Sequence, residues 1–280
     1  MNIRKIVFVC NPSQPLAEQL ALQLAGFLRQ KGVESEILND YRKLSQAQPS
    51  ELCVSLGGDG TALRCARQAA PLGLPLLAIN CGSLGFLSAC EAEEAQNCLE
   101  QILTGNFHST QRVLLQGRIL HKDGTVTENL LAFNDCVIKT ADPLAFTLRA
   151  DWNGKELKHF YGDGVIVSTP AGSTAYSLAA GGPIVAPDLD AWVITPICPH
   201  SLTERPIILR ADGQLIFEPL FRNKQEKVVV SFDGQHSYAL EPKEKVCLQC
   251  YPHKAQLISA GSFDFFGRLR QKLEWGNRNA

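Results

Sequence analysis

Apolar positions in the first hundred residues follow two different periods. Four short apolar runs predict buried β-strands: residues 3–10, 34–38, 52–56 and 74–79. Three segments predict α-helices: residues 16–31, 62–69 and a stretch ending near Leu103, which Ser88 and Glu91 can open as a capping box. The polar residues 39–50 predict a loop or a short irregular helix. This alternation predicts a Rossmann-like α/β domain with a parallel sheet over residues 1–105.

The pattern changes near residue 106, where strand-like runs follow one another with short turns. Asn153-Gly154 between two such runs is a strong hairpin signal. Residues 106–258 therefore predict an all-β, sandwich-like domain interrupted by one helix-capable piece, residues 174–180. Residues 259–280 form an amphipathic tail in which Leu269 lies among basic residues. We expect a tail helix that returns to the N-terminal domain, with docking on a partner subunit as the alternative.

Composition excludes several classes of protein. With 280 residues, 45% of them hydrophobic and a net charge of −1, the chain is typical of a globular protein and lacks the basic excess of a nucleic-acid binder. It has no apolar run of about 18 residues, so we expect no membrane partner. The N-terminal apolar run is too short for a secretory signal, and ten scattered cysteines indicate a reduced, cytoplasmic protein.

Cys247 and Cys250 form a lone CxxC, for which packing is favoured over metal or redox chemistry, and no His/Cys cluster has metal spacing.

The segment Gly57–Thr61 joins a predicted strand to a predicted helix. Its glycines let a ligand approach the backbone and permit positive φ, and the start of the helix favours an anion. A carboxylate repels phosphate, so Asp59 indicates a proton-transfer or metal-binding role. The alternative is that Asp59 is simply the helix N-cap. Arg64, about one turn later, can pair with phosphate or be a solvated arginine.

Three further segments carry candidate chemistry. The run from Gly172 to Ser177 offers hydroxyls and the ring of Tyr176, or else is a serine N-cap with tight helix packing. Asn134-Asp135 stands at the start of a strand and can cap a turn. Asp233-Gly234 predicts a hairpin turn, after which Gln235 can face a ligand.

Taken together, these segments resemble the bacterial NAD kinases of the ATP-NAD kinase family. The resemblance covers most of the chain, and the run Gly172–Ser177 is its most specific part, because lipid kinases and phosphofructokinases carry turns similar to Gly57–Thr61. The matching segments are Gly57–Thr61, Asn80 with Gly82–Leu87, Asn134-Asp135, Asp163-Gly164, Ser168–Ser177, Gly181–Ile184, Pro196–His200 and Leu269–Trp275.

The resemblance implies an activity and an assembly. The activity is transfer of the γ-phosphate of ATP to the adenosine ribose 2′-hydroxyl of NAD, which forms NADP, with a divalent metal ion such as Mg²⁺. The implied architecture is an α/β domain followed by a β-sandwich, in a homo-oligomer that is a dimer or a tetramer. NAD and ATP are the implied small-molecule partners.

The resemblance also implies roles for individual residues. Asp59 would be the catalytic proton acceptor, with Gly60 and Arg64 beside it. Phe86 would pack near an adenine, Asn134 and Asp135 would hold ribose hydroxyls, and residues from Asp163 and Thr174 onward would bind the nicotinamide half and the ligand of a neighbouring subunit. The implied NAD- and ATP-binding residues are Gly58, Asp59, Gly60, Arg64, Asn80, Phe86, Asn134, Asp135, Tyr161, Asp163, Thr174, Ala175, Tyr176, Ser177, Leu178, Ala179 and Gln235.

Two positions depart from the family pattern. Many relatives carry Glu at the position of Asp135, and many carry Arg at the position of Tyr161. The side chain of Asp135 is one methylene shorter than that of Glu, which changes its reach to a ribose hydroxyl. The position of Tyr161 faces the nicotinamide side in the family, so the residue there affects the preference between NAD and NADH. The alternatives to a kinase of NAD are a non-catalytic NAD(P)-binding sensor and a lipid kinase that shares the Gly57–Thr61 turn.

Overall fold

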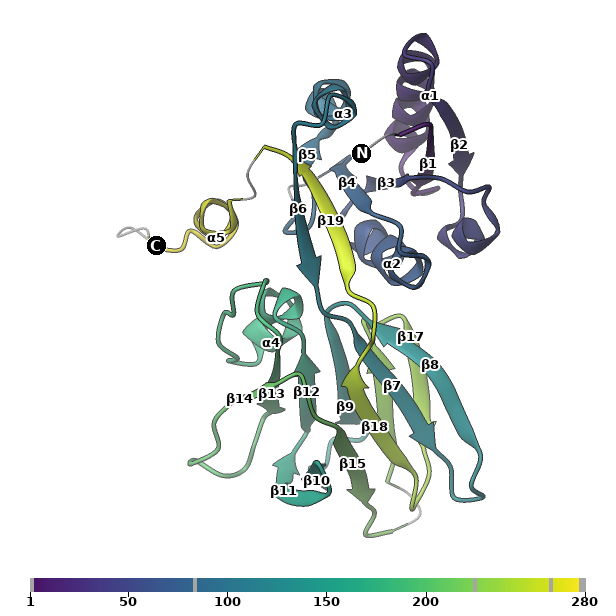
Figure 1. The fold of residues 1–280 in the computed structure, drawn as a ribbon. Coiled ribbons are helices and arrows are strands. Elements are labelled where there is room, and N and C mark those ends of the chain that lie inside the picture. Colours follow the sequence, from purple (N-terminus) through teal and green to yellow (C-terminus); the bar gives the residue numbers. More distant parts are fainter. Residues whose placement is uncertain (1–2, 83–84, 224–225, 262–263, 277–280) are drawn as a thin grey trace. The chain divides into compact units, whose positions relative to one another are not determined.

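The computed structural model describes residues 3–82, 85–223, 226–261 and 264–276 (Figure 1). Residues 262–263 and 277–280 of the predicted tail therefore lie outside the described residues. The chain forms two compact units, Met1–Arg112 with His253–Ala280, and Val113–Pro252. The boundaries predicted from the sequence, 105 and 258, differ from these. The reason is that β6 (Phe107–Arg112) and β19 (Ala255–Ala260) pair with each other and extend the sheet of the first unit.

The first unit contains a mostly parallel sheet with the strand order β2-β1-β3-β4-β19-β6, and β5 pairs with β4. Strands β1 to β4 and β19 are parallel, and β6 is antiparallel to β19. A strand from the end of the chain thus completes the N-terminal sheet. The remaining strands are β1 (Lys5–Cys10), β2 (Glu34–Leu38), β3 (Leu52–Gly57), β4 (Leu76–Asn80) and β5 (Cys90–Glu91).

Helices cover both faces of this sheet. Alternate side chains of a strand point to opposite faces. Ile6 and Phe8 of β1 share a buried cluster with side chains of α1 and α3, whereas the thiol of Cys53 is hydrogen-bonded to that of Cys65 of α2 on the other face. The α-helices are α1 (Pro15–Gln30), α2 (Asp59–Ala69), α3 (Ala95–Leu103) and the tail helix α5 (Phe265–Leu273), and 3-10 turns occur at Tyr41–Gln46, Ala70–Leu72 and Ala92–Glu94.

The predicted capping box is wrong. Glu91 lies in β5, which pairs with the end of β4, and α3 begins only at Ala95 without a side-chain cap. Pairing with a neighbouring strand, which a local motif does not encode, has overridden the capping pattern.

The second unit is a sandwich of two six-stranded antiparallel sheets, with the orders β11-β10-β15-β18-β7-β8 and β14-β13-β12-β9-β16-β17. The predicted class, an α/β domain plus a β-sandwich, is confirmed. Its strands are β7 (Leu115–Leu120), β8 (Val126–Ala132), β9 (Asp135–Thr140), β10 (Phe146–Trp152), β11 (Lys155–Gly162), β12 (Gly164–Ser168), β13 (Ala191–Ile197), β14 (Ile207–Arg210), β15 (Leu215–Leu220), β16 (Val228–Phe232), β17 (His236–Leu240) and β18 (Lys245–Cys250).

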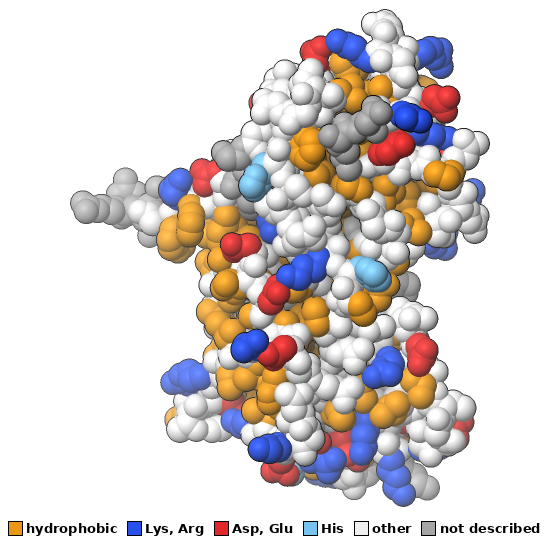
Figure 2. Space-filling model, viewed as in Figure 1, with side chains coloured by type: hydrophobic (Ala, Val, Ile, Leu, Met, Phe, Trp, Pro, Cys, Tyr) orange, Lys and Arg blue, Asp and Glu red, His pale blue; other side chains and the backbone are white. Residues whose placement is uncertain are grey.

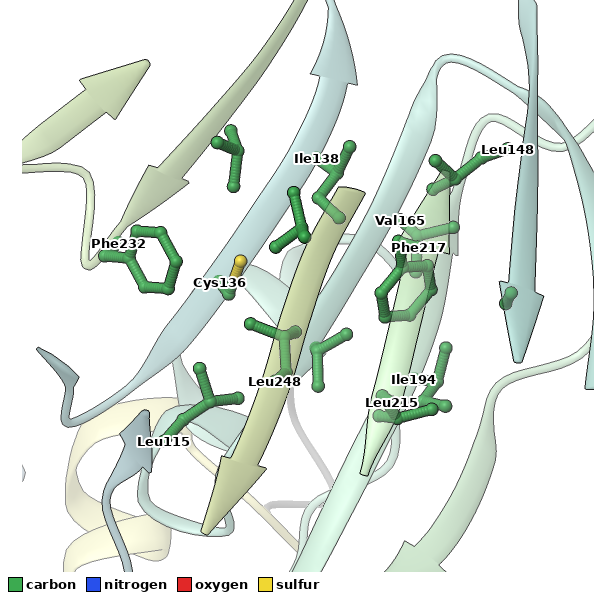
Figure 3. Close-up of a cluster of buried hydrophobic side chains, with 14 of the residues drawn as sticks. Leu115, Cys136, Ile138, Leu148, Val165, Ile194, Leu215, Phe217, Phe232 and Leu248 are labelled. Atoms are coloured by element: carbon green, nitrogen blue, oxygen red, sulfur yellow. The ribbon is translucent and has the colours of Figure 1, made fainter. Parts of the chain in front are cut away.

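The core of the sandwich lies between the inner faces of its two sheets, where Phe217 and Leu248 lie opposite Cys136 and Val165 (Figure 3). The helical piece predicted over 174–180 is the short helix α4 (Tyr176–Ala179), which follows a 3-10 turn at Ala171–Thr174. Cys247 and Cys250 are three residues apart on β18, so their side chains point to opposite faces.

The visible surface carries acidic and basic side chains that are mixed, without a continuous patch of one sign (Figure 2). Among the described residues, no helix combines the length and the apolar character needed to cross a bilayer.

Candidate functional site

The Gly57–Thr61 turn lies at the carboxyl end of β3, where α2 begins. Gly58 is the N-cap, with extended φ and ψ of −91° and −174°. None of the three glycines adopts the positive φ that glycine permits. Gly57 is required by packing, since a Cβ there would lie 2.5 Å from Thr61 Oγ1. No atom would lie within 4 Å of a Cβ at Gly58, and one at Gly60 would meet only Arg64, at 3.9 Å. The backbone beside Asp59 is therefore open to a ligand.

The carboxylate of Asp59 does not cap α2. Its Oδ2 accepts a hydrogen bond from the backbone N–H of Phe86 at 2.7 Å, and its Oδ1 accepts one from Leu87 at 3.0 Å. Gly85 permits this approach, because a Cβ there would lie 1.9 Å from Asp59 Oδ1. The Asp59 side chain is 35% exposed. It is thus held in a fixed orientation and remains accessible, and the interpretation of Asp59 as the N-cap is wrong.

The tail helix α5 supplies two cations to this segment. Arg268 Nη1 donates to the Gly85 carbonyl at 2.8 Å, and Lys272 Nζ lies 3.9 Å from Asp59 Oδ2 and 4.7 Å from the Phe86 ring centroid. Arg268 and Lys272 are four residues apart and so share one face of the helix. The sequence predicted that this basic amphipathic tail returns to the N-terminal domain, and the contacts of Arg268 and Lys272 agree with that prediction. It did not predict that the tail meets the Gly85-Phe86 segment, or that Gly85 lies against the Asp59 carboxylate.

Two other predicted residues of the first unit have clear surroundings. Asn80 is buried, and its side chain amide donates to the Gly82 carbonyl and to the Glu91 carboxylate, so it braces the turn after β4. Arg64 lies over the ring of Tyr41, 5.6 Å from its centroid. Ser83 and Leu84 of the predicted glycine-bearing loop lie outside the described residues.

In the second unit, the start of β9 is held by a residue whose role the sequence did not reveal. The carboxylate of Asp233 accepts hydrogen bonds from the backbone N–H groups of Phe133, Asn134 and Asp135, at 2.9, 2.8 and 3.1 Å. Asp233 has the positive φ of 52° that its turn requires, as the Asp-Gly signal predicts. The hairpin therefore brings Gln235 to the same end of the sheet as Asn134 and Asp135.

The Gly172–Ser177 run packs against this end of the sheet. A Cβ at Gly172 would lie 2.1 Å from the Asn134 carbonyl oxygen, so only glycine fits. Ser173 is buried and bonded to Pro170 and Val185, and the hydroxyl of Ser177 is bonded to that of Thr195 at 2.8 Å. The serine N-cap is wrong, because Ala175 precedes α4 and has no side-chain cap, whereas the tight packing is present.

The members of the run that face outward are different residues. Thr174, Ala175 and Leu178 are half-buried, and Tyr176 and Ala179 are exposed. These side chains, rather than those of Ser173 and Ser177, are available to a ligand.

Asp135 is a buried acid beside a second acid. Burial, together with the nearby charge of Asp233, raises the pKa of Asp135 to about 7. Asp233 accepts three N–H donors, and its charge beside the buried Asp135 favours the protonated form of Asp135.

Tyr161 and Asp163 lie elsewhere in the second unit. The register pairs Ser168 with Asp135 and Gly164 with Lys139, which puts Asp163 at the opposite end of β12, roughly 16 Å from Asp135. There the ring of Tyr161 lies 4.9 Å from that of His200, and Cys198 is hydrogen-bonded to the Asp163 side chain. The predicted site residues of this unit thus form two clusters, not one.

No group of three or more His, Cys, Asp or Glu side chains is arranged to hold a metal ion within the described ranges. Mg²⁺ is commonly bound by one or two carboxylates together with substrate phosphates. The accessible oxygens of Asp59 fit that donor set.

Comparisons with known proteins show the family to which the chain is similar. Residues 45–107 match the ATP-NAD kinase N-terminal domain, and residues 133–260 match the ATP-NAD kinase C-terminal domain. The chain is 34% identical to the NAD kinase of Treponema denticola over 99% of both chains. It is 36% identical to the NAD kinase of Citrifermentans bemidjiense, over 99% of this chain and 100% of that one.

Two solved structures share the fold. Yeast NADH kinase complexed with NADH has a TM-score of 0.85 at 23% identity, over 99% of this chain and 89% of that one. The NAD kinase from Archaeoglobus fulgidus in complex with ATP has a TM-score of 0.74 at 22% identity, over 96% and 98%. With its two domain matches and its full-length relatives, the chain belongs to the ATP-NAD kinase family.

Proposed function

We propose that this protein is an NAD kinase that transfers the γ-phosphoryl group of ATP to the 2′-hydroxyl of the adenosine ribose of NAD. The observation that carries the proposal is the Asp59 carboxylate, oriented by two backbone N–H groups beside an open glycine backbone. Full-length similarity to bacterial NAD kinases supports the choice of acceptor.

Asp59 acts as the proton acceptor. As the bond between the ribose 2′-oxygen and the γ-phosphorus forms, the bond from that phosphorus to the β–γ bridging oxygen breaks, the hydroxyl proton passes to Asp59, and ADP leaves. A ribose hydroxyl is a weak nucleophile, and an aligned base contributes roughly 10²–10⁴-fold to the rate. The N–H groups of Phe86 and Leu87 fix the direction of the carboxylate, and positioning is the main protein contribution to phosphoryl transfer.

A divalent metal ion, Mg²⁺ for preference, accompanies ATP. When bound, it neutralises negative charge on the phosphates. Asp59 would offer this ion a hard oxygen ligand beside the open glycine backbone. Lys272 Nζ, 3.9 Å from Asp59 Oδ2, adds positive charge.

Residues at one end of the sandwich recognise NAD. Asn134 and Asp135 hold ribose hydroxyls, and Gln235, Thr174 and Tyr176 line the same end of the sheet. Support comes from the Asp233 hydrogen bonds and the Gly172 contact, which fix the start of β9. Asp163 and Tyr161, at the far end of β12, contact the ligand of a neighbouring subunit.

The protein is a homo-oligomer, a dimer or a tetramer. Strand β14 is an edge strand of its sheet, and Ile207 and Ile208 on it are 39% and 50% exposed. An exposed apolar edge strand favours association.

Ile208→Glu should lower the molar mass measured by light scattering to that of a smaller species. Leu22→Glu, at a 62% exposed position on α1, is the matched control. An unchanged mass for Ile208→Glu would exclude this edge as the interface.

The protein works in a reducing compartment, the cytoplasm. All ten cysteines are free, and seven of them are buried as small apolar side chains.

The test of the function is a coupled assay of NADP formation from NAD, ATP and Mg²⁺, repeated with NADH and with polyphosphate. Formation of NADP is expected with NAD and ATP. Tight NAD binding without phosphoryl transfer from any donor would establish a sensor instead. Phosphorylation of a diacylglycerol, with none of NAD, would establish a lipid kinase.

A further inference from the structure

The tail helix α5 reaches the Asp59 carboxylate by two routes. Lys272 lies directly beside it, with Nζ 3.9 Å from Asp59 Oδ2. Arg268, one turn earlier on the same face of the helix, binds the segment that holds the carboxylate, because its Nη1 donates to the Gly85 carbonyl at 2.8 Å. Lys272 has a place in the proposed reaction, whereas Arg268 has none yet.

The peptide group between Gly85 and Phe86 connects Arg268 to Asp59. Its carbonyl oxygen accepts the hydrogen bond from Arg268, and its N–H donates to Asp59 Oδ2 at 2.7 Å. Because a peptide group is planar, a bond that fixes the direction of its carbonyl also fixes the direction of its N–H. A cationic donor on the carbonyl also polarises the amide, which strengthens the hydrogen bond that the N–H makes.

Gly85 makes this support from outside the segment important. The residue must be glycine for Asp59 to approach, since a Cβ would lie 1.9 Å from Asp59 Oδ1. Glycine also has the greatest backbone freedom of any residue. The peptide group that follows it therefore rotates easily unless another group holds it, and the bond from Arg268 supplies such a hold.

Helix α5 keeps Arg268 in position. Asp264 caps the start of the helix, and Leu269, next to Arg268, is only 1% exposed, so this turn is packed in place. Burial lowers the pKa of the Arg268 guanidinium, an effect that the charge of Asp59 opposes. Arginine keeps its proton in proteins, and a cation that is partly removed from water needs polar partners. The Gly85 carbonyl is one of those partners.

We propose that Arg268 is a positioning residue for phosphoryl transfer, which holds the peptide group between Gly85 and Phe86 so that its N–H fixes the Asp59 carboxylate. The inference rests on the proposed kinase activity and deepens it, because it makes the C-terminal helix necessary for turnover. Arg268 acts through Asp59 and not on a substrate, so its loss should slow turnover and leave substrate binding nearly unchanged.

The test uses Arg268→Met, which keeps an apolar stem and removes the donor. Arg270→Met is the matched control, because Arg270 lies on the same helix with its side chain 59% exposed. Arg268→Met should lower kcat roughly 10–100-fold, since a misplacement of about 1 Å can cost on the order of 10²-fold, with the KM values for NAD and ATP close to wild type. Arg268→Lys, which restores a cationic donor, should recover part of the loss.

A double variant shows whether Arg268 acts through Asp59. The base is absent in Asp59→Asn, so addition of Arg268→Met should lower kcat by less than about twofold further. Losses that multiply would mean that Arg268 acts elsewhere and would overturn the proposal. A kcat for Arg268→Met equal to that of Arg270→Met would overturn it as well.

The backbone amide of Phe86 gives a readout that does not depend on activity. Its proton resonance should lie at low field in the wild-type protein, because the bond to a carboxylate is short. It should move to higher field in Arg268→Met and stay in place in Arg270→Met. An unchanged resonance in Arg268→Met would rule out the positioning role. If the wild-type protein makes no NADP but the resonance moves as expected, the kinase function fails and the positioning of Asp59 by Arg268 stands.

Discussion

Replacement of Asp135 by asparagine should change the way in which the stability of the protein depends on pH. Asp135 is 6% exposed and has the negative charge of Asp233 beside it. Burial and this charge together raise its pKa from the ordinary value of 3.8 to about 7. The folded protein therefore keeps a proton that the unfolded chain releases above about pH 4.

The size and the sign follow from this difference. The pKa rises by about three units, and each unit corresponds to about 1.4 kcal/mol, so the fully ionised carboxylate costs the fold about 4 kcal/mol. The cost is absent below pH 4, where both states hold the proton. It grows as the pH rises and is complete above pH 7, so between pH 5 and pH 8 the free energy of unfolding should fall by about 3 kcal/mol through Asp135 alone.

The assay is urea unfolding at pH 5 and pH 8. Asp135→Asn should lose this part of the pH dependence and be more stable than wild type at pH 8. Glu128→Gln, which neutralises an exposed carboxylate in the same unit, should keep the wild-type dependence. If Asp135→Asn and wild type change equally between the two pH values, Asp135 is not the buried acid described here.

Two glycine substitutions test the packing around two candidate groups of residues, one in each unit. Gly85→Ala places a Cβ 1.9 Å from Asp59 Oδ1. Because the Asp59 side chain can move away, we expect a large loss of NADP formation with little change in melting temperature. Full activity would mean that this position of the carboxylate is not required. Gly172→Ala meets the Asn134 backbone at 2.1 Å and should destabilise the protein by about 1–3 kcal/mol and raise the KM for NAD. Its control, Gly26→Ala in α1, has no atom within 4 Å and should stabilise by about 0.5–1 kcal/mol, so equal stability of the two variants would argue against the Gly172 contact.

The sequence predicted the local elements because their signals are local. The apolar run 52–56 became β3, the helical spacing after Leu16 became α1, and Asn153-Gly154 formed its hairpin with positive φ at both residues. The sequence did not predict that β19 joins the first sheet, because that pairing joins residues 255–260 to residues 76–77 and 107–112. Pairing between strands that are so far apart in the sequence produces no periodic pattern of residues in either segment.

In the candidate site, too, the local features were predicted and the long-range contacts were not. The types of residue at the Gly57–Thr61 turn indicated an anion and a base, but the partners of Asp59, the N–H groups of Phe86 and Leu87, lie 27 and 28 residues away. Asp233 was identified only as a turn residue, because the Asp-Gly signal fixes the backbone and does not say what the carboxylate binds.

The central claim is that Asp59 takes the proton from the 2′-hydroxyl of NAD. The most direct measurement is the turnover of Asp59→Asn at saturating NAD, ATP and Mg²⁺, together with NAD affinity from calorimetry. Asparagine keeps the shape and one acceptor oxygen but is not a base. We expect kcat to fall roughly 10²–10⁴-fold while the Kd for NAD stays close to wild type. Undiminished turnover would contradict the account and remove Asp59 from the base role.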